Sequence, residues 1–326
     1  MAIIDIHNHV TPRRFVAAIE RDGVWHTLGP DVGELHIPAF SISPEDRIAE
    51  MDAIGVDVHV LTVNTDFFRY DLDAGLARTI ADECNDELLG MMRGFPDRFT
   101  GLASVPLQDV PTAIDVMAHA VTELGFRGIT LGDHVEGVTL DDPRFSPFWA
   151  AVEDLGAVVF FHQCSATVVA SRTRRYGLPN VIGNLADRTI TFATLVYGGV
   201  MDRYPGLKIC LGHAGGYTAF GAARMDKGWH AGALENMPEF DDGRAFLERA
   251  PSDYLSRFWY DSCTYTEQNL RFLLDVVGGD RVVLGTDYPA PMMEPDPVSW
   301  IQAMNSLTAE EKQAVLSANA TSLLGL

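Results

Sequence analysis

Short apolar runs and longer amphipathic segments alternate along almost the whole chain. The apolar runs are rich in β-branched residues and are hydrophobic at nearly every position, as expected for parallel strands that are buried on both faces. We therefore expect eight strands, at Ala2–Ile6, Val56–Val63, Phe99–Val105, Gly128–Leu131, Ala157–His162, Lys208–His213, Phe258–Asp261 and Arg281–Thr286.

The segments between these runs have the apolar spacing of helices. Ser43 and Pro44 suit the N-cap and the first turn of a helix, and Gly55, Gly125 and Gly156 suit helix ends, where the backbone often becomes left-handed. The spacing predicts helices at Pro44–Ile54, Leu72–Met92, Pro111–Leu124, Pro147–Leu155, Asn184–Asp202, Thr218–Lys227, Glu267–Val277 and Ala309–Leu324.

Eight strand–helix units in succession predict an α/β fold of the (β/α)8, TIM-type barrel class, with an open doubly wound sheet as the structural alternative. Two segments are longer than the connections of a simple strand–helix repeat: residues 11–43, after the first strand, and residues 228–256. Long loops in compact domains usually serve as lids, binding walls or subunit contacts, and we expect such roles for both insertions. No change in composition marks a boundary, so the sequence predicts one domain over residues 1–326.

The composition narrows the range of partners. The chain has 24 Lys and Arg against 45 Asp and Glu, a formal net charge of −21. This charge repels nucleic acids and anionic membrane surfaces, so we expect neither as a partner, and an anionic substrate would need locally placed arginines. The four cysteines form no CxxC pair, and no signal peptide or membrane-spanning run is evident. A protein of the reducing cytoplasm is therefore expected.

Polar residues end four of the predicted strands. His7 and His9 lie two residues apart and so point to the same face of the first strand, while His162, His213 and Asp287 end later strands. In a barrel the carboxyl ends of the strands form one rim, where catalytic residues gather. Imidazoles with a carboxylate suit one divalent transition metal, with zinc expected and manganese, iron or cobalt as alternatives.

The remaining histidines have weaker claims to a functional role. His59 lies in the middle of a strand and is expected to be a core residue. His134 follows the fourth strand and stays a weak candidate for the site. Surface or packing roles are expected for His26, His36, His119 and His230.

Over nearly its whole length, the sequence resembles the amidohydrolase superfamily. Within this superfamily it is similar to the decarboxylase branch typified by α-amino-β-carboxymuconate-ε-semialdehyde decarboxylase. A His-x-His pair alone is a weak signal, but an ordered set of motifs is a strong one. The motifs that carry the resemblance are Asp5–His9, Arg47–Asp52, Gly55–Asp57, Gly101–Leu102, Pro106–Gln108, Leu124–Gly128, Gly198–Val200, Tyr204–Pro205, Gly212–Gly216 and Leu284–Pro289.

The resemblance implies roles for particular residues. His213 matches the acid–base residue that lies beside the metal-bound water and is not itself a ligand. Arg47 and Arg224 resemble two arginines that bind substrate carboxylates, the second reaching in from a neighbouring subunit, which implies a homodimer. The branch typically has Pro-Trp after its fifth-strand histidine, whereas this chain has Gln163-Cys164, so its pocket differs there. The family's metal ligands match His7, His9, His162 and Asp287.

The resemblance therefore implies a metal-dependent, non-oxidative decarboxylase of an unsaturated or aromatic carboxylic acid, without an organic cofactor. The metal would act as a Lewis acid, and a histidine can exchange protons near neutral pH. Hydrolysis of an amide, ester or lactone and hydration of a conjugated acid would use the same ligands and stay as alternatives. A non-catalytic metal-binding protein would be expected to lack His213, which is present.

Overall fold

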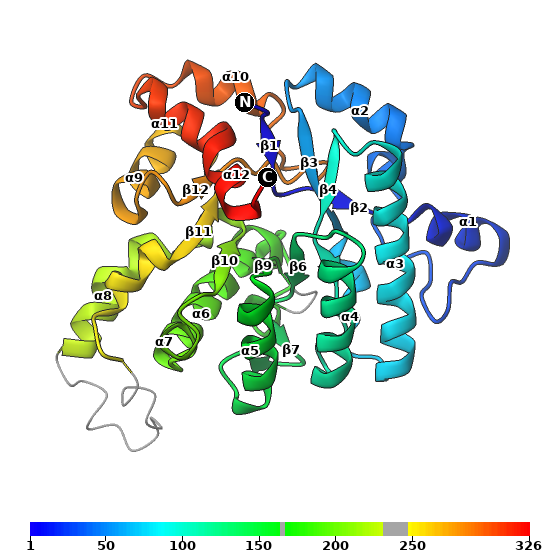
Figure 1. Ribbon diagram of the computed structural model, residues 1–326, viewed down its shortest axis with the longest axis horizontal. Helices are drawn as coiled ribbons and strands as arrows, with labels where there is room; N and C mark the ends of the chain where they lie inside the picture. Colours follow the sequence, from blue (N-terminus) through cyan, green and yellow to red (C-terminus); the bar gives the residue numbers. More distant parts are fainter. Residues whose placement is uncertain (164–166, 231–246) are drawn as a thin grey trace.

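Short parallel strands surrounded by helices make up the computed structural model, which describes residues 1–163, 167–230 and 247–326 (Figure 1). Each strand pairing within the two sheets that follow is parallel, as the continuous apolar runs predict. The strands of these two sheets are β1 (Ile4–Asp5), β2 (His9–Val10), β3 (Val58–Val63), β4 (Phe99–Gly101), β5 (Ala103–Ser104), β6 (Gly128–Leu131), β9 (Val158–Phe161), β10 (Lys208–Leu211), β11 (Phe258–Asp261) and β12 (Val282–Val283).

The strands follow one another around the fold in chain order. One sheet has the order β1-β3-β2 with β4 beside β3, and the other has the order β12-β11-β10-β9-β6-β5. Backbone hydrogen bonds connect the two sheets at both junctions: Ile6 N donates to Leu284 O at 3.0 Å, and Leu102 N donates to Leu61 O at 3.0 Å. The (β/α)8 prediction is therefore confirmed, and the alternative of an open doubly wound sheet is wrong.

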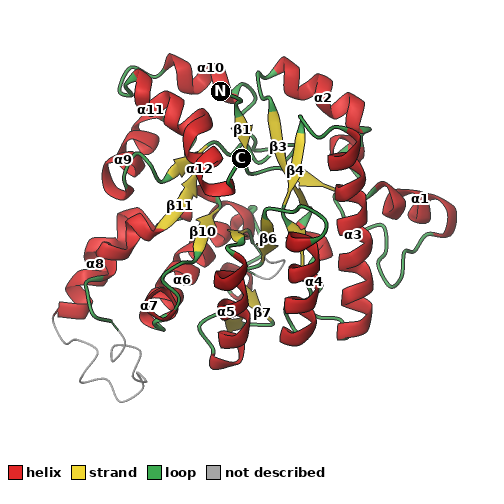
Figure 2. Ribbon diagram, in the orientation of Figure 1, coloured by secondary structure: helices red, strands yellow, loops and turns green. Residues whose placement is uncertain are grey.

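Helices cover the outside of the strands (Figure 2). The predicted N-cap of the helix at Pro44–Ala53 is confirmed, because the Ser43 hydroxyl accepts a hydrogen bond from Asp46 N at 3.0 Å. The helices are α1 (Arg13–Asp22), α2 (Pro44–Ala53), α3 (Ala74–Gly94), α4 (Val110–Thr122), α5 (Ser146–Leu155), α6 (Asn184–Tyr197), α7 (Val200–Arg203), α8 (Thr218–His230), α9 (Glu267–Val277), α10 (Pro297–Ala303), α11 (Ala309–Gln313) and α12 (Asn319–Leu324).

Two predicted helices are interrupted. The helix expected over Asn184–Asp202 divides into α6 and α7, because Gly199 has a left-handed φ of 70°. The helix expected over Ala309–Leu324 contains a π-helical turn at Ala314–Ala318 between α11 and α12. Of the two insertions, residues 11–43 contain α1 and a 3-10 turn at Pro38–Ser41. Residues 231–246 of the second insertion lie outside the described part of the chain.

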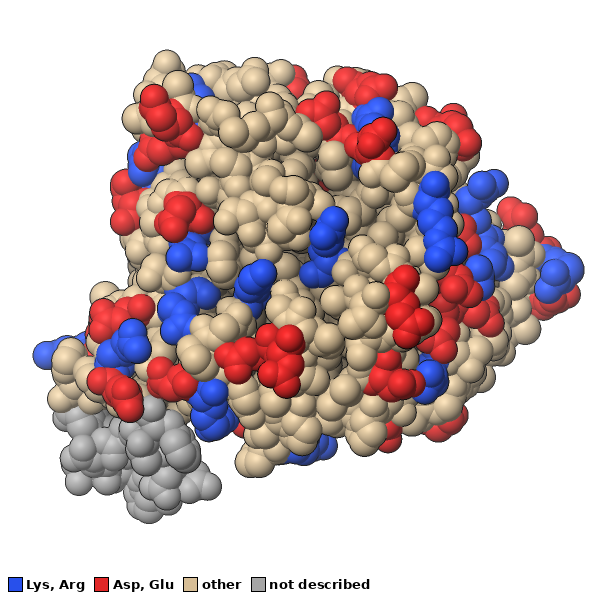
Figure 3. Space-filling view, viewed as in Figure 1, with Lys and Arg blue, Asp and Glu red and all other residues tan. Residues whose placement is uncertain are grey.

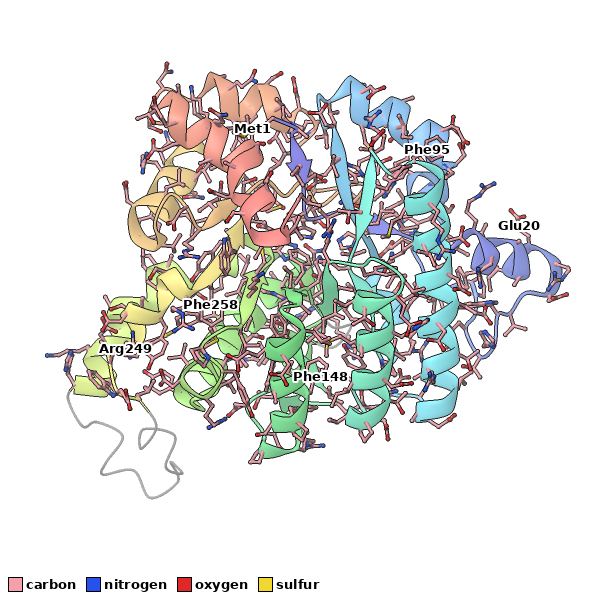
Figure 4. The ribbon with its side chains drawn as sticks, viewed as in Figure 1. Met1, Glu20, Phe95, Phe148, Arg249 and Phe258 are labelled. Atoms are coloured by element: carbon pink, nitrogen blue, oxygen red, sulfur yellow. The ribbon has the colours of Figure 1, made fainter. Side chains whose placement is uncertain are left out.

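Apolar packing forms two layers that hold the strand ends in place. The larger layer lies between the strands and the surrounding helices, and Phe148 on α5 and Phe258 at the start of β11 belong to it (Figure 4). The smaller one joins strand residues such as Ile6 and Phe160 to Leu323 of α12. Because Phe160 and His162 are two residues apart, they share one face, and the histidine lies just beyond this packed interior.

The surface carries charges of both signs, with Asp and Glu interspersed among Lys and Arg on the face shown in Figure 3. The acidic residues outnumber the basic ones along the chain, 45 to 24. Among the described helices, none is both long enough and apolar enough to cross a membrane.

Candidate metal centre

Four side chains, located in or after strands β1, β2, β9 and β12, converge on one point. His7 follows β1, His9 begins β2, His162 follows β9 and Asp287 follows β12. One potential ligand atom from each lies within 4.8 Å of the others. The Nε2 atoms of His7 and His9 are each 3.1 Å from Asp287 Oδ1, and that of His162 is 3.9 Å away. The residues predicted as metal ligands are thus brought together.

The donor atoms of this cluster suit a metal ion. His7 Nε2 and both ring nitrogens of His162 are buried and form no hydrogen bond with any described residue. Buried polar atoms without a partner are costly, and coordination of a cation would satisfy them. Burial, followed by the influence of His9, lowers the pKa of His162 well below its ordinary value, so its ring is neutral with a lone pair available. Three imidazoles and one carboxylate are typical ligands of a divalent transition metal.

The backbone turns sharply where Asp287 joins the cluster. Asp287 has a φ of 63°, an uncommon conformation for a residue other than glycine. Its N–H donates to His7 O at 2.8 Å, and His9 N donates to Tyr288 O at 2.8 Å. These bonds tie the end of the last strand to the first strand. They hold the Asp287 carboxylate beside the two histidines.

A second carboxylate, that of Asp261 at the end of β11, supports the cluster from behind. Its Oδ2 lies 2.5 Å from His7 Nδ1 and accepts a hydrogen bond from His213 N at 2.8 Å. Its Oδ1 accepts from Ala214 N at 2.7 Å and from Cys263 N at 3.1 Å. A carboxylate on the outer nitrogen fixes the tautomer and orientation of a metal-binding histidine. Asp261 was not among the predicted site residues, although it is a charged residue at the end of a buried strand. The same pattern identified Asp287.

His213 lies beside the four-residue cluster and is separate from it. Its Nε2 is 3.7 Å from Asp287 Oδ2, and its ring centroid is 5.0 Å from those of His7 and His162. Within the described part of the chain, its buried Nδ1 has no hydrogen-bond partner, and its φ of 54° turns the chain sharply after β10. The geometry therefore places a proton-carrying side chain next to the candidate metal position.

The two arginines expected to bind substrate have different surroundings. Arg47 is buried: its guanidinium donates to Asn8 Oδ1 at 3.4 Å and to the His9 carbonyl, and it lies 4.8 Å from the centre of the Tyr288 ring. Burial lowers the pKa of Arg47 to about 10, so it stays charged at neutral pH. Arg224 is exposed on α8. Neither side chain lines the cavity described next, and their substrate-binding roles stay predictions.

A cavity of about 250 Å³ opens beside the candidate metal position. His9, His162 and Asp287 form part of its wall. The first insertion contributes Glu34 and Phe40 to this wall, and its role as a lid, binding wall or subunit contact stays a prediction. The other polar side chains of the wall are Asn64, Thr65, Asp66, Gln163, Thr167, Asn180 and Asn184. Gln163, at the position where the decarboxylase branch has proline, thus faces the cavity, while Cys164 lies outside the described residues.

Two further histidines lie outside the cluster. His59 is fully buried, with its Nε2 3.4 Å from Asp5 Oδ2, and is the core residue that its position predicts. His134 lines a separate cavity together with Asp133 and Asp187, so the structure does not bring it to the metal centre. Burial raises the pKa of Asp133 to about 6, although its carboxylate pairs with Arg188.

Comparison with known proteins places this site in a family. The amidohydrolase family model matches residues 4–326. The chain is 32% identical to a 2-amino-3-carboxymuconate-6-semialdehyde decarboxylase of Dictyostelium discoideum, covering 99% of this chain and 91% of that one. It is 29% identical to a γ-resorcylate decarboxylase of Rhodococcus jostii, covering 86% and 87% of the two chains.

Solved structures agree with these relatives. A 5-carboxyvanillate decarboxylase of Novosphingobium aromaticivorans, complexed with manganese and a nitrobenzoic acid, superposes with a TM-score of 0.84 at 25% identity. The match covers 100% of this chain and 96% of the other. The structural match supports the barrel, and the cluster of three histidines and one aspartate supports a single divalent metal site. The chain is a member of the amidohydrolase family, within a group of enzymes that includes non-oxidative decarboxylases.

Proposed function

We propose that this protein catalyses the metal-dependent, non-oxidative decarboxylation of an aromatic or conjugated unsaturated carboxylic acid. The observation that carries the proposal is the placement of His213 beside the cluster of His7, His9, His162 and Asp287. Three members of this cluster, His9, His162 and Asp287, line a cavity. The relatives from Dictyostelium discoideum and Rhodococcus jostii support the choice of reaction, because both are decarboxylases.

The chemistry requires a proton donor and an electron acceptor. The four cluster residues would hold one divalent cation, which when bound supplies a Lewis acid for a substrate oxygen. His213 delivers a proton to the substrate carbon that bears the carboxylate. The bond between that carbon and the carboxylate then breaks, carbon dioxide leaves, and the electron pair of the broken bond restores the double bond of the ring or diene. His213 regains a proton from solvent before the next turnover.

The wall of the cavity suits a small, hydroxylated acid. At about 250 Å³ it lies below the size range of pockets for drug-sized ligands, so a single-ring or short-chain acid fits it best. Phe40 lies over His9, with 6.4 Å between ring centroids, and helps to exclude water from the cluster. The side-chain amides of Asn64, Asn180 and Asn184 can bind hydroxyl or carbonyl substituents.

Four finer features belong to the same proposal. Zinc is the metal that the ligand set favours, and manganese, present in the Novosphingobium relative, is the main competitor. The exposed position of Arg224 on α8 suits a residue that reaches the site of a second subunit in a homodimer. Arg47 would affect substrate binding indirectly. Its guanidinium donates a hydrogen bond to the His9 carbonyl and so holds the strand that contains His9. The absence of a CxxC pair suits the cytoplasm.

Metal analysis combined with a test for carbon dioxide release would decide the proposal. The purified protein should contain about one divalent metal per chain and release carbon dioxide from 2,6-dihydroxybenzoate, 5-carboxyvanillate or a carboxymuconate semialdehyde. Metal-free protein should be inactive and regain activity when the metal is restored. Hydrolysis of esters, amides or lactones, or hydration of conjugated acids, without carbon dioxide from any carboxylate would contradict it.

A further inference from the structure

Three arginines lie close together in the segment between β9 and α6. This segment, residues 167–183, begins and ends at the wall of the metal cavity, because Thr167 and Asn180 both line it. Arg172, Arg174 and Arg175 lie between these two residues, and all three are exposed. The chain therefore carries three positive charges within four residues, in a segment that reaches the cavity wall on both sides of them.

The segment has a defined conformation near the arginines. It contains a 3-10 turn at Val168–Ser171 and a π-helical turn at Pro179–Gly183. Its start is anchored to α6, since the Asp187 carboxylate accepts a hydrogen bond from Val168 N at 3.1 Å. Leu178 N donates to Arg175 O at 3.2 Å and closes the turn that carries the last arginine. The backbone thus holds the three charges in a fixed place relative to the cavity.

These three charges are not neutralised within the described part of the chain. None of the three arginines forms an ion pair there, and Arg175 lies 5.3 Å from the centre of the Tyr176 ring. Some other exposed arginines are paired: Arg21 lies 2.7 Å from Asp22, and Arg78 lies 2.7 Å from Asp115. Uncompensated basic residues are notable in a protein with a net charge of −21.

The cavity itself has the opposite charge. Glu34, Asp66 and Asp287 contribute carboxylates to its wall, and none of the described wall residues is a lysine or an arginine. An approaching carboxylate is therefore repelled by the protein as a whole and by the cavity wall until a bound metal attracts it at short range. The three arginines of the β9–α6 segment supply attraction at the cavity mouth.

We propose that Arg172, Arg174 and Arg175 form an anion-capture site that draws small carboxylates to the mouth of the metal cavity. The inference rests on the proposed function only in that the ligand is a carboxylate. The range over which such a site attracts anions depends on the ionic strength, because the Debye length is about 30 Å at 0.01 M and about 3 Å at 1 M. It accelerates association, and it leaves dissociation and the chemical step unchanged.

Stopped-flow fluorescence with two probes of nearly the same shape tests this site. Salicylate is an anion and salicylamide is neutral, and both fluoresce, so their association with the metal-loaded protein can be followed in the first moments after mixing, before product accumulates. In Arg172→Gln/Arg174→Gln/Arg175→Gln, the association rate of salicylate at 0.01 M ionic strength should fall about tenfold, the lower end of the range for electrostatic steering. The rate for salicylamide should stay the same, and the salicylate difference should vanish at 1 M salt.

The matched control removes the same charge from the opposite end of the barrel. Arg127, Arg203 and Arg257 precede β6, β10 and β11, so they lie near the amino ends of strands. Their triple replacement by glutamine should leave the association rate of salicylate within about twofold of the wild-type value, because charges at the far end of the barrel act on the cavity over a longer distance. An equal loss in this control would show that net charge alone matters and would overturn the proposal.

Other results would overturn it as well. Equal losses for salicylate and salicylamide, or a loss that persists at 1 M salt, would show that the segment shapes the cavity and does not attract anions. Wild-type protein that binds salicylate no faster than salicylamide at low salt would have no capture site. If instead the capture result holds but no carboxylic acid releases carbon dioxide, the proposed function fails and the anion-capture site stands.

Discussion

Replacement of Asp261 by asparagine tests how the metal centre is organised. The carboxylate of Asp261 contacts His7 Nδ1 at 2.5 Å and accepts hydrogen bonds from the N–H groups of His213, Ala214 and Cys263. Asparagine has nearly the same shape but only one acceptor oxygen. Its amide NH2 must therefore face either the His7 ring together with the His213 N–H, or the N–H groups of Ala214 and Cys263. In both orientations the negative charge beside His7 Nδ1 is lost. We expect the His7 ring to lose its fixed orientation toward the cluster.

The size of the effect follows from the contact that is lost. A hydrogen bond to a charged group contributes about 1.5–3 kcal/mol. Mutation of a residue that orients a metal-binding histidine typically weakens metal affinity by about 10–100-fold, which corresponds to about 1.4–2.7 kcal/mol. The two estimates agree. The expected loss is moderate because His7, His9, His162 and Asp287 are all retained, and only the carboxylate that supports His7 is changed.

Metal affinity is the quantity to measure. Metal-stripped protein would be titrated with Mn²⁺, with free Mn²⁺ followed by electron paramagnetic resonance, and Tm would be recorded for the same metal-free samples. Asp133→Asn is the matched control, because Asp133 is a buried carboxylate that pairs with Arg188 and accepts from Thr191 Oγ1 at 2.7 Å, outside the four-residue cluster. Its Mn²⁺ affinity should change by less than about twofold, the scatter expected for independent sites.

Two outcomes would refute this reasoning. Unchanged Mn²⁺ affinity in a folded Asp261→Asn protein would show that the contact with His7 is dispensable. Equal losses of affinity in Asp261→Asn and Asp133→Asn, in proportion to their losses of Tm, would show that general destabilisation, and no specific support of His7, is the cause.

Three further predictions concern single residues. His162→Ala should lose tightly bound metal, seen as a metal content well below that of the wild type after dialysis against a chelator; full retention would contradict the ligand set. His213→Gln should keep its metal but lower kcat by about 10²–10⁴-fold, the usual contribution of a general acid or base, and unaltered turnover would exclude the proton role. The raised pKa of Asp133, about 6, means that folding takes up a proton there. This stabilisation is complete below about pH 4 and is lost as pH rises through 6, so the free energy of unfolding should fall less with pH in Asp133→Asn than in the wild type, and equal slopes in urea titrations would contradict it.

The ligand cluster could be predicted because its signal is strong and local. A buried parallel strand is apolar at almost every position, so a histidine or aspartate at its end is conspicuous. Parallel strands in a barrel bring their carboxyl ends to one rim, so residues as distant as His7 and Asp287 meet without any knowledge of side-chain packing. The eight strands and the metal cluster therefore followed from periodicity alone. The separate role of His213 did not, and was inferred from the resemblance.

Other features depend on packing that the sequence does not display. The π-helical turn at Ala314–Ala318 leaves the apolar periodicity nearly unchanged, so the predicted helix passed through it. Arg47 was expected to face substrate, yet its long side chain turns to Asn8 and to the His9 carbonyl. An arginine on a helix can reach in several directions, and only the neighbouring residues determine which one it takes.

Asp261 and Asp287 show where such prediction reaches its limit. Both are aspartates at or just beyond the end of a buried strand, and both lie next to His7. They differ in the backbone: Asp261 is still part of β11, and its carboxylate accepts N–H groups from neighbouring turns, whereas Asp287 follows β12 with a φ of 63° that directs its carboxylate to the cluster. A polar residue at a strand end thus indicates a place on the rim. Whether it becomes a ligand or the support of a ligand is decided by the turn that follows.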